Sequence, residues 1–131
     1  NPDNAMFHAT LGSIFNNIGQ YQNAENSLKK AVELDETLAD AWYQLGFLSV
    51  EKANALVEKM NASGVSQSKF NAYKKEQTGH YKAALPYFEK ALELDPENLD
   101  TMEALKVVYY KLDMYPEMKA IKAKISALTG K

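Results

Sequence analysis

The chain has 131 residues, of which 46% are hydrophobic, which fits one domain with a hydrophobic core. Its formal net charge of −2 excludes the broad basic surface that nucleic-acid binding needs, so nucleic acid is not an expected partner. The lack of cysteine excludes disulfides and thiolate chemistry, and no apolar run approaches the ~20 residues of a membrane span. We therefore expect a soluble chain with no membrane partner, in a compartment that the sequence does not reveal.

Apolar residues recur at helical spacing along the whole chain, which predicts an all-α fold. The expected helices cover residues 4–18, 21–35, 38–61, 67–94, 98–112 and 115–128. Short polar side chains precede several of these segments, as is typical of helix N-caps. The expected caps are Thr37 for the third helix, Ser66 or Ser68 for the fourth, and Asn98 for the fifth.

The sequence repeats itself at an interval of 34 residues. Leu11-Gly12 recurs as Leu45-Gly46, and Tyr81 recurs as Tyr115. A period of 34 is typical of stacked helix–turn–helix units, none of which can bury its apolar face alone. The expected units cover residues 5–38, 39–98 and 99–131, with the last helix acting as a C-terminal cap.

Over essentially its whole length, the chain resembles the tetratricopeptide repeat family, whose pattern is Trp-x2-Leu-Gly-x2-Tyr, then Ala-x3-Phe, then Pro. The matching residues are Trp42, Leu45, Gly46, Tyr81, Ala84, Phe88, Ala91 and Pro96. The resemblance implies an α-α superhelix that serves as a protein-interaction scaffold. Small residues such as Gly12 and Gly46 are expected where helices approach closely, with Leu28 and Phe88 filling the space that they leave.

The middle unit is longer than one period by about 26 residues. Tyr21 and Tyr81 are 60 residues apart, which indicates an insertion near residues 53–78. The insertion could lengthen both helices of the unit or form a separate excursion from a normal turn. Because the apolar stripes continue in phase into the repeat, we expect elongated helices that project past their neighbours. Gly79 and Pro86 predict a bend in the returning helix.

The C-terminal unit is more polar than the earlier units, whereas the N-terminal residues resemble the end of a preceding unit. Lys106 and Lys122 replace the small and large apolar residues of the earlier units, which indicates a polar end of the array. Asn1-Pro2 parallels Asp95-Pro96, which precedes the third unit. We therefore expect the sequence to be a piece of a longer array.

The third helix carries a second apolar face beside its core stripe. Tyr43, Phe47 and Val50 lie on this face at i, i+4 and i+7. The family resemblance implies that first helices line a concave surface, so we expect a partner-binding groove with an aromatic floor. Its expected residues are Ser13, Asn16, Asn17, Asp40, Tyr43, Phe47, Val50, Glu103, Val107 and Tyr110. The alternative is that Phe47 and Tyr110 pack between adjacent units.

The residue types on this face indicate which kind of ligand it could bind. Some family members hold the C-terminal carboxylate of chaperones with Lys, Asn and Arg there. Ala9, Ser13, Asp40, Asp100 and Ala104 occupy the corresponding region here, so the resemblance does not carry that clamp over. We expect a protein or peptide ligand with apolar or basic side chains.

No catalytic group stands out in the sequence. His8 and His80 lie in different units without a matching motif, and no metal or phosphate motif is present. We therefore expect no enzyme activity, no catalytic residue, no cofactor and no metal. Two alternatives to a peptide-binding scaffold remain: self-association into a homo-oligomer, and a regulatory or recruiting segment of a larger protein.

Overall fold

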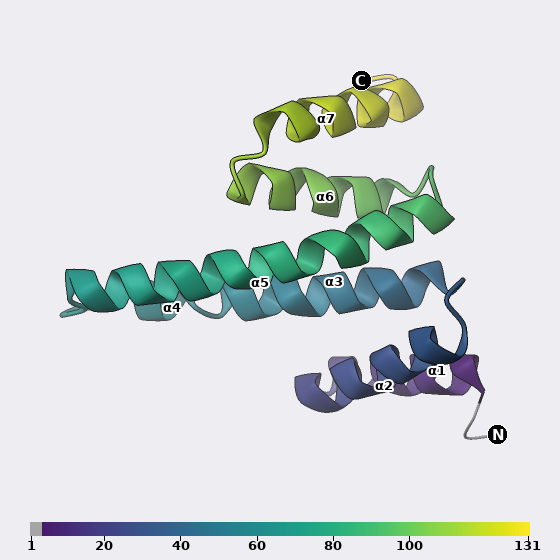
Figure 1. Ribbon diagram of the computed structural model, residues 1–131, viewed down its shortest axis with the longest axis horizontal. Helices are drawn as coiled ribbons and strands as arrows, with labels where there is room; N and C mark the ends of the chain where they lie inside the picture. Colours follow the sequence, from purple (N-terminus) through teal and green to yellow (C-terminus); the bar gives the residue numbers. More distant parts are fainter. Residues whose placement is uncertain (1–3) are drawn as a thin grey trace.

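The computed structural model describes residues 4–131, and every regular element in this range is a helix (Figure 1). The helices are α1 (Ala5–Asn17), α2 (Tyr21–Leu34), α3 (Ala39–Asn54), α4 (Val57–Met60), α5 (Gln67–Leu94), α6 (Leu99–Lys111) and α7 (Tyr115–Thr129). This arrangement confirms the predicted all-α fold. The predicted parallel at Asn1-Pro2 lies outside the described residues.

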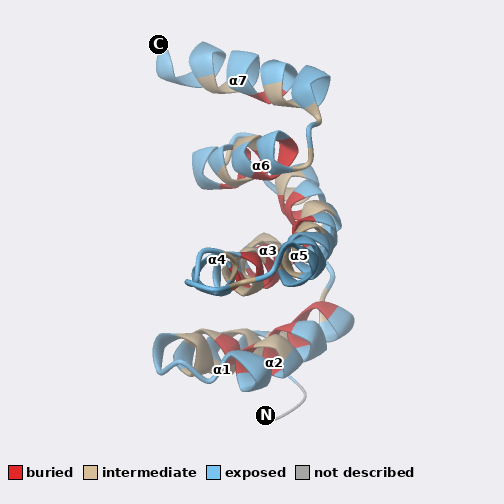
Figure 2. Ribbon diagram, turned by 90° about the vertical axis from the view of Figure 1, so that its left-hand side faces the viewer, coloured by how far each residue is buried: buried red, intermediate tan, exposed pale blue. Residues whose placement is uncertain are grey.

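The helices stack in pairs to form an α-α superhelix. α1 packs on α2, α3 on α5, and α6 on α7, while α2 and α6 connect these pairs by packing on α3 and α5. In Figure 2, α1, α3 and α6 lie on one side of the stack, and α2 and α5 lie on the other. This layout confirms the expected superhelix, while the division into three units stays a prediction.

Side-chain caps fix the beginnings of α5 and α6. The Ser66 side-chain oxygen accepts a hydrogen bond from the Lys69 amide at 3.1 Å. The Asn98 side-chain oxygen accepts one from the Thr101 amide at 2.9 Å. Each bond satisfies a backbone donor that has no partner within its helix. The expected caps Ser66 and Asn98 are therefore confirmed.

The expected cap Thr37 is wrong. The N-cap of α3 is Leu38, whose side chain makes no capping bond. Instead, the Thr37 amide and hydroxyl both donate to the Asp35 carboxylate, at 2.9 Å and 2.6 Å. Thr37 thus closes a local turn with the end of the preceding helix. A short polar residue before a helix does not reveal which neighbouring group it will bond.

Glycine is required where paired helices approach most closely. A Cβ atom on Gly12 would lie 2.7 Å from Leu28 Cγ, and one on Gly46 would lie 2.7 Å from Phe88 Cε1. Both large side chains are fully buried. The close approach expected at these two glycines is therefore confirmed, because no side chain fits between the helices without displacing a core residue.

The core consists of two clusters of buried residues in series. Both clusters include residues of α3, so this helix joins the two halves of the molecule. The first cluster contains Ala24, Leu28, Ala31, Val32, Ala41, Leu45 and Leu48. The second contains Ala53, Tyr81, Ala84, Phe88, Met102, Leu105, Val108, Tyr109 and Ile121.

The middle helices project past their neighbours, as expected (Figure 1). α5 is one continuous helix of 28 residues, which confirms the predicted returning arm. It is curved in Figure 1, although the placement of a bend between Gly79 and Pro86 stays a prediction. The predicted helix over 38–61 is wrong as a single element, because α3 ends at Asn54 and α4 begins at Val57.

The buried side chain of Gln77 bonds to the backbone at this interruption. Its Nε2 donates to the Ala53 carbonyl at 3.3 Å, and the Leu56 amide donates to the same carbonyl at 3.2 Å. The Leu56 bond spans three residues instead of four, so the helix tightens and its regular ladder ends. The Tyr81 hydroxyl also donates to the Asn54 side chain at 3.1 Å. Leu56 remains buried in phase with the apolar stripe, which is why periodicity alone predicted continuity.

Candidate functional site

Two open hollows lie between α1 and α3 and between α3 and α6. Figure 2 shows these three helices on the same side of the molecule. The hollow between α1 and α3 is lined by Ser13, Asn16, Asn17, Asp40, Tyr43, Gln44 and Phe47. The hollow between α3 and α6 is lined by Tyr43, Phe47, Val50, Phe88, Asp100, Glu103, Ala104 and Val107. Because Tyr43 and Phe47 border both hollows, we treat them as one surface, called the groove.

The groove brings together nine of the ten residues expected from the sequence. The exception is Tyr110, which lines a neighbouring hollow between α6 and α7 with Lys106, Val107, Met118 and Lys122. The Tyr110 ring lies 6.4 Å from that of Tyr115. The structure therefore places all the expected residues except Tyr110 on one surface, and their role in binding a partner stays a prediction.

Four lining residues are absent from the expected groove set: Gln44, Phe88, Asp100 and Ala104. Two of them, Asp100 and Ala104, were nevertheless placed on this face by the family resemblance, in the region where some family members hold a carboxylate. Phe88 was assigned entirely to the core. Its ring is indeed buried, but it also forms part of the groove floor.

The apolar floor of the groove is accessible to a partner. Phe47 is 38% exposed and Val107 is 45% exposed. The Tyr43 ring is half-buried and lies 5.6 Å from the Phe88 ring, which supports it from below. Phe47 therefore keeps part of its apolar surface accessible, and Tyr110 is also exposed.

A short chain of hydrogen bonds orders the polar wall between α1 and α3. The Ser13 hydroxyl donates to Gln44 Oε1 at 2.9 Å, and Gln44 Nε2 donates to Asp40 Oδ2 at 2.7 Å. On the same wall, Asn16 Oδ1 is buried and has no hydrogen-bond partner among residues 4–131. A buried acceptor without a donor costs about 1–3 kcal/mol. A ligand donor would relieve this cost if the Asn16 side chain turned into the groove.

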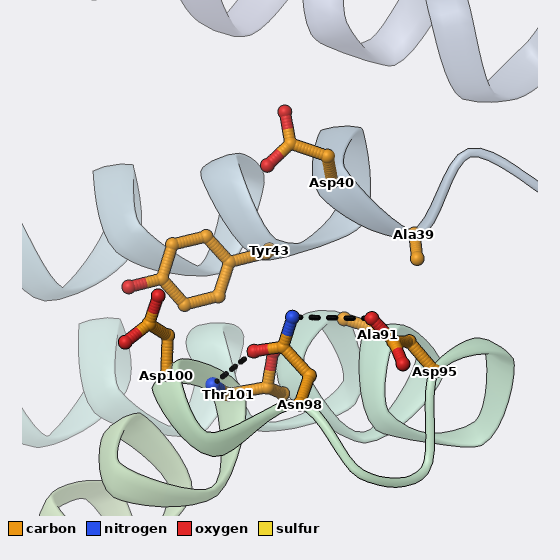
Figure 3. Close-up of a pocket in the computed structure, with 8 residues that line it drawn as sticks. All are labelled: Ala39, Asp40, Tyr43, Ala91, Asp95, Asn98, Asp100 and Thr101. Atoms are coloured by element: carbon orange, nitrogen blue, oxygen red, sulfur yellow. Dashed lines mark hydrogen bonds between the residues drawn. The ribbon is translucent and has the colours of Figure 1, made fainter.

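Negative charge borders the groove where α3 and α6 begin. In Figure 3 the Tyr43 ring extends from α3 toward α6, with the Asp100 carboxylate beside its hydroxyl end and Asp40 on its other side. Burial raises the pKa of the Tyr43 hydroxyl, and the charges of Asp100 and Asp40 raise it further. In the described part of the chain, no lysine lies within 4.0 Å of either carboxylate. By contrast, Glu103 is paired with Lys106 at 2.8 Å.

A small polar cavity of about 110 Å³ adjoins the groove at Tyr43 (Figure 3). Asp95 and Asn98 line it, but both are engaged within the protein. The side-chain nitrogen Nδ2 of Asn98 donates to the Asp95 carboxylate at 3.1 Å, and the Asn98 side-chain oxygen caps α6. Because Asp40, Tyr43 and Asp100 also line this cavity, it is a polar extension of the groove rather than a separate site.

The described residues include no group of three or more histidine, aspartate or glutamate side chains placed to hold a metal ion. Over the same range, no helix is both long and apolar enough to span a bilayer.

Comparison with known families is consistent with this architecture. Residues 12–52 match a family model described as a TPR repeat, and residues 72–98 match one described as a tetratricopeptide repeat. The chain belongs to the tetratricopeptide repeat family. The two matches leave out residues 53–71 of this tetratricopeptide repeat chain, which lie within the expected insertion. A search of curated proteins gave no match.

Tetratricopeptide repeats are generally non-catalytic scaffolds that bind proteins or peptides. On that ground, the groove is the surface of this tetratricopeptide repeat protein that we consider for partner binding.

Proposed function

We propose that this domain is a protein-interaction scaffold that binds a peptide or protein segment in the groove, without catalysis. The exposed apolar floor around Phe47 and Val107 is the observation that carries this proposal. Apolar surface that stays exposed in a continuous hollow, rimmed by polar residues, is typical of interaction sites. The α3–α6 hollow has a volume of about 320 Å³, at the lower end of the range for ligand pockets, which suits one or two side chains of a segment.

Paired double variants test this proposal. Peptides that bind the intact chain are first selected from a random phage-displayed library, and their affinities are measured by fluorescence anisotropy. The groove variant F47A/V107A is compared with L34A/V57A, whose target residues lie outside the groove and are similarly exposed, at 41% and 42%. We expect weaker binding only in the groove variant, with unchanged helical content by circular dichroism.

Equal affinity of the selected peptides for wild type and F47A/V107A would overturn the groove assignment. Equal losses in both double variants would show a non-specific effect of removing exposed apolar groups, and would also contradict it.

The outer face of α1 supports self-association as a second candidate function. Phe7, Ile14 and Ile18 fall at i, i+7 and i+11, and all three side chains are exposed. Two such faces could pair in a homodimer. Light scattering over a range of concentrations tests this candidate, with I14S/I18S as the disrupting variant. A mass that stays monomeric at every concentration would eliminate it.

The third alternative is that this domain recruits partners for a larger protein. Such a segment would bind them in the same groove, so no further structural feature distinguishes it from the scaffold.

A further inference from the structure

We propose that the groove selects segments in which a lysine or arginine lies within two residues of a large apolar side chain. The cation would lie between Asp40 and Asp100 beside the Tyr43 ring, and the apolar side chain would enter the α3–α6 hollow. This inference rests on the proposed function, because it specifies the ligand of the same groove.

Charge complementarity is the first argument. Asp40 and Asp100 border the groove, and no lysine in the described residues lies within 4.0 Å of them. Asp40 is also held in place, because Gln44 donates to its carboxylate at 2.7 Å. An ordered carboxylate without a cationic neighbour favours a cation in the ligand and repels an anion.

The Tyr43 ring gives the second argument. It lies between the two carboxylates in Figure 3, and the groove exposes part of the ring. A lysine ammonium or an arginine guanidinium is attracted to the face of an aromatic ring. The aliphatic part of the same side chain can lie along the ring while its charged end reaches a carboxylate.

The third argument is the adjacency of the polar and apolar parts of the groove. Tyr43 and Asp100 both line the α3–α6 hollow, together with Phe47, Ala104 and Val107. The position for a cation therefore borders directly on the apolar hollow. In an extended segment, side chains two residues apart lie on the same side at a spacing of about 7 Å. A basic residue and an apolar residue at that separation can occupy both positions at once.

The experiment compares peptides selected on three forms of the intact chain. These are the wild type, the groove variant D40N/D100N, and the matched control E33Q/E58Q. The control removes two exposed carboxylates of α2 and α4 outside the groove. The probe is the same random phage-displayed peptide library for all three forms.

We expect peptides from the wild type and the control to be enriched in lysine or arginine within two positions of a large apolar residue. Their affinity should fall about tenfold in D40N/D100N, as the sum of two modest charge interactions. The loss should shrink at high salt, because screening already weakens those interactions in the wild type.

The outcomes separate this inference from the proposed function. Peptides that lose affinity in F47A/V107A but lack a basic preference, or bind D40N/D100N as well as the wild type, would overturn the inference alone. Selected peptides that bind F47A/V107A normally would overturn the proposed function. Failure to enrich any peptide would count against both.

Discussion

The ring of Phe88 occupies the space that the missing side chain of Gly46 leaves open. A Cβ atom on Gly46 would lie within 2.9 Å of three atoms of that ring. Phe88 also supports the Tyr43 ring, whose centroid lies 5.6 Å away, and lines the α3–α6 hollow. The close approach of α3 and α5 therefore fixes the floor of the groove as well as the core.

The first prediction concerns this contact. Overpacking a core costs about 1–3 kcal/mol, and the better helix propensity of alanine offsets about 1 kcal/mol. Because Phe88 is fully buried, we expect G46A to lower the free energy of unfolding by up to about 2 kcal/mol. Urea denaturation followed by circular dichroism measures the difference.

The matched control is G79A. Gly79 lies in α5, and a Cβ there would meet no atom within 4 Å. We expect this variant to be more stable than the wild type by about 0.5–1 kcal/mol, because alanine favours a helix over glycine. Equal stability changes in G46A and G79A would contradict the packing account.

The second prediction concerns the break between α3 and α4. Q77M keeps most of the side-chain volume but removes the donor to the Ala53 carbonyl. We expect a loss of about 1 kcal/mol, the usual net contribution of one hydrogen bond. Q67M changes an exposed glutamine of the same helix and should stay within about 0.5 kcal/mol of the wild type. A Q77M variant as stable as Q67M would show that the bond does not stabilise the break.

The third prediction concerns pH. Glu25 of α2 lies 3.0 Å from Lys52 of α3 and 3.2 Å from Lys29. Burial alone would raise the pKa of the Glu25 carboxyl, but the hydrogen bonds and charges of both lysines outweigh burial and lower it. The stabilisation is therefore complete above the ordinary glutamate pKa of about 4.3 and is lost as pH falls through the lowered value.

We expect E25Q to be less stable than the wild type at neutral pH by up to about 1 kcal/mol, because both lysines are partly exposed. The difference should shrink as the pH falls below about 4. Urea denaturation at several pH values measures this trend. A difference that stays constant or grows in acid would contradict the assigned role of Glu25.

Much of the fold could be predicted from the repeat period and from the pairing of small and large apolar residues. The 34-residue period predicted stacked helix pairs, and the family resemblance implied the superhelix. The Gly46–Phe88 pair predicted a close helix contact, and the 60-residue offset with its continuous apolar stripes predicted the long middle helices. The break at Leu56 was missed; there the Ala53 carbonyl accepts a hydrogen bond from Gln77, a residue of another helix. Periodicity records which side of a helix is buried, but it cannot record a hydrogen bond from another helix.

Most of the residues that line the candidate site could be predicted from the sequence, but the position of Tyr110 could not. Helical spacing placed Tyr43, Phe47 and Val50 together, because residues at i, i+4 and i+7 share a face. Tyr110 was assigned to the same surface, but it lies beyond Val107 in the α6–α7 hollow. Its placement depends on how α7 packs on α6, and the pattern of one helix does not contain that information.

The central claim is that partners occupy the groove, and amide chemical-shift mapping tests it most directly. A peptide selected from the random library is titrated into the ¹⁵N-labelled intact chain. We predict that the largest shifts fall on residues of α1, α3 and α6 around Asp40, Tyr43, Phe47 and Val107. Largest shifts on α2, on the outer half of α5, or on the Phe7–Ile14 face of α1 would contradict the account.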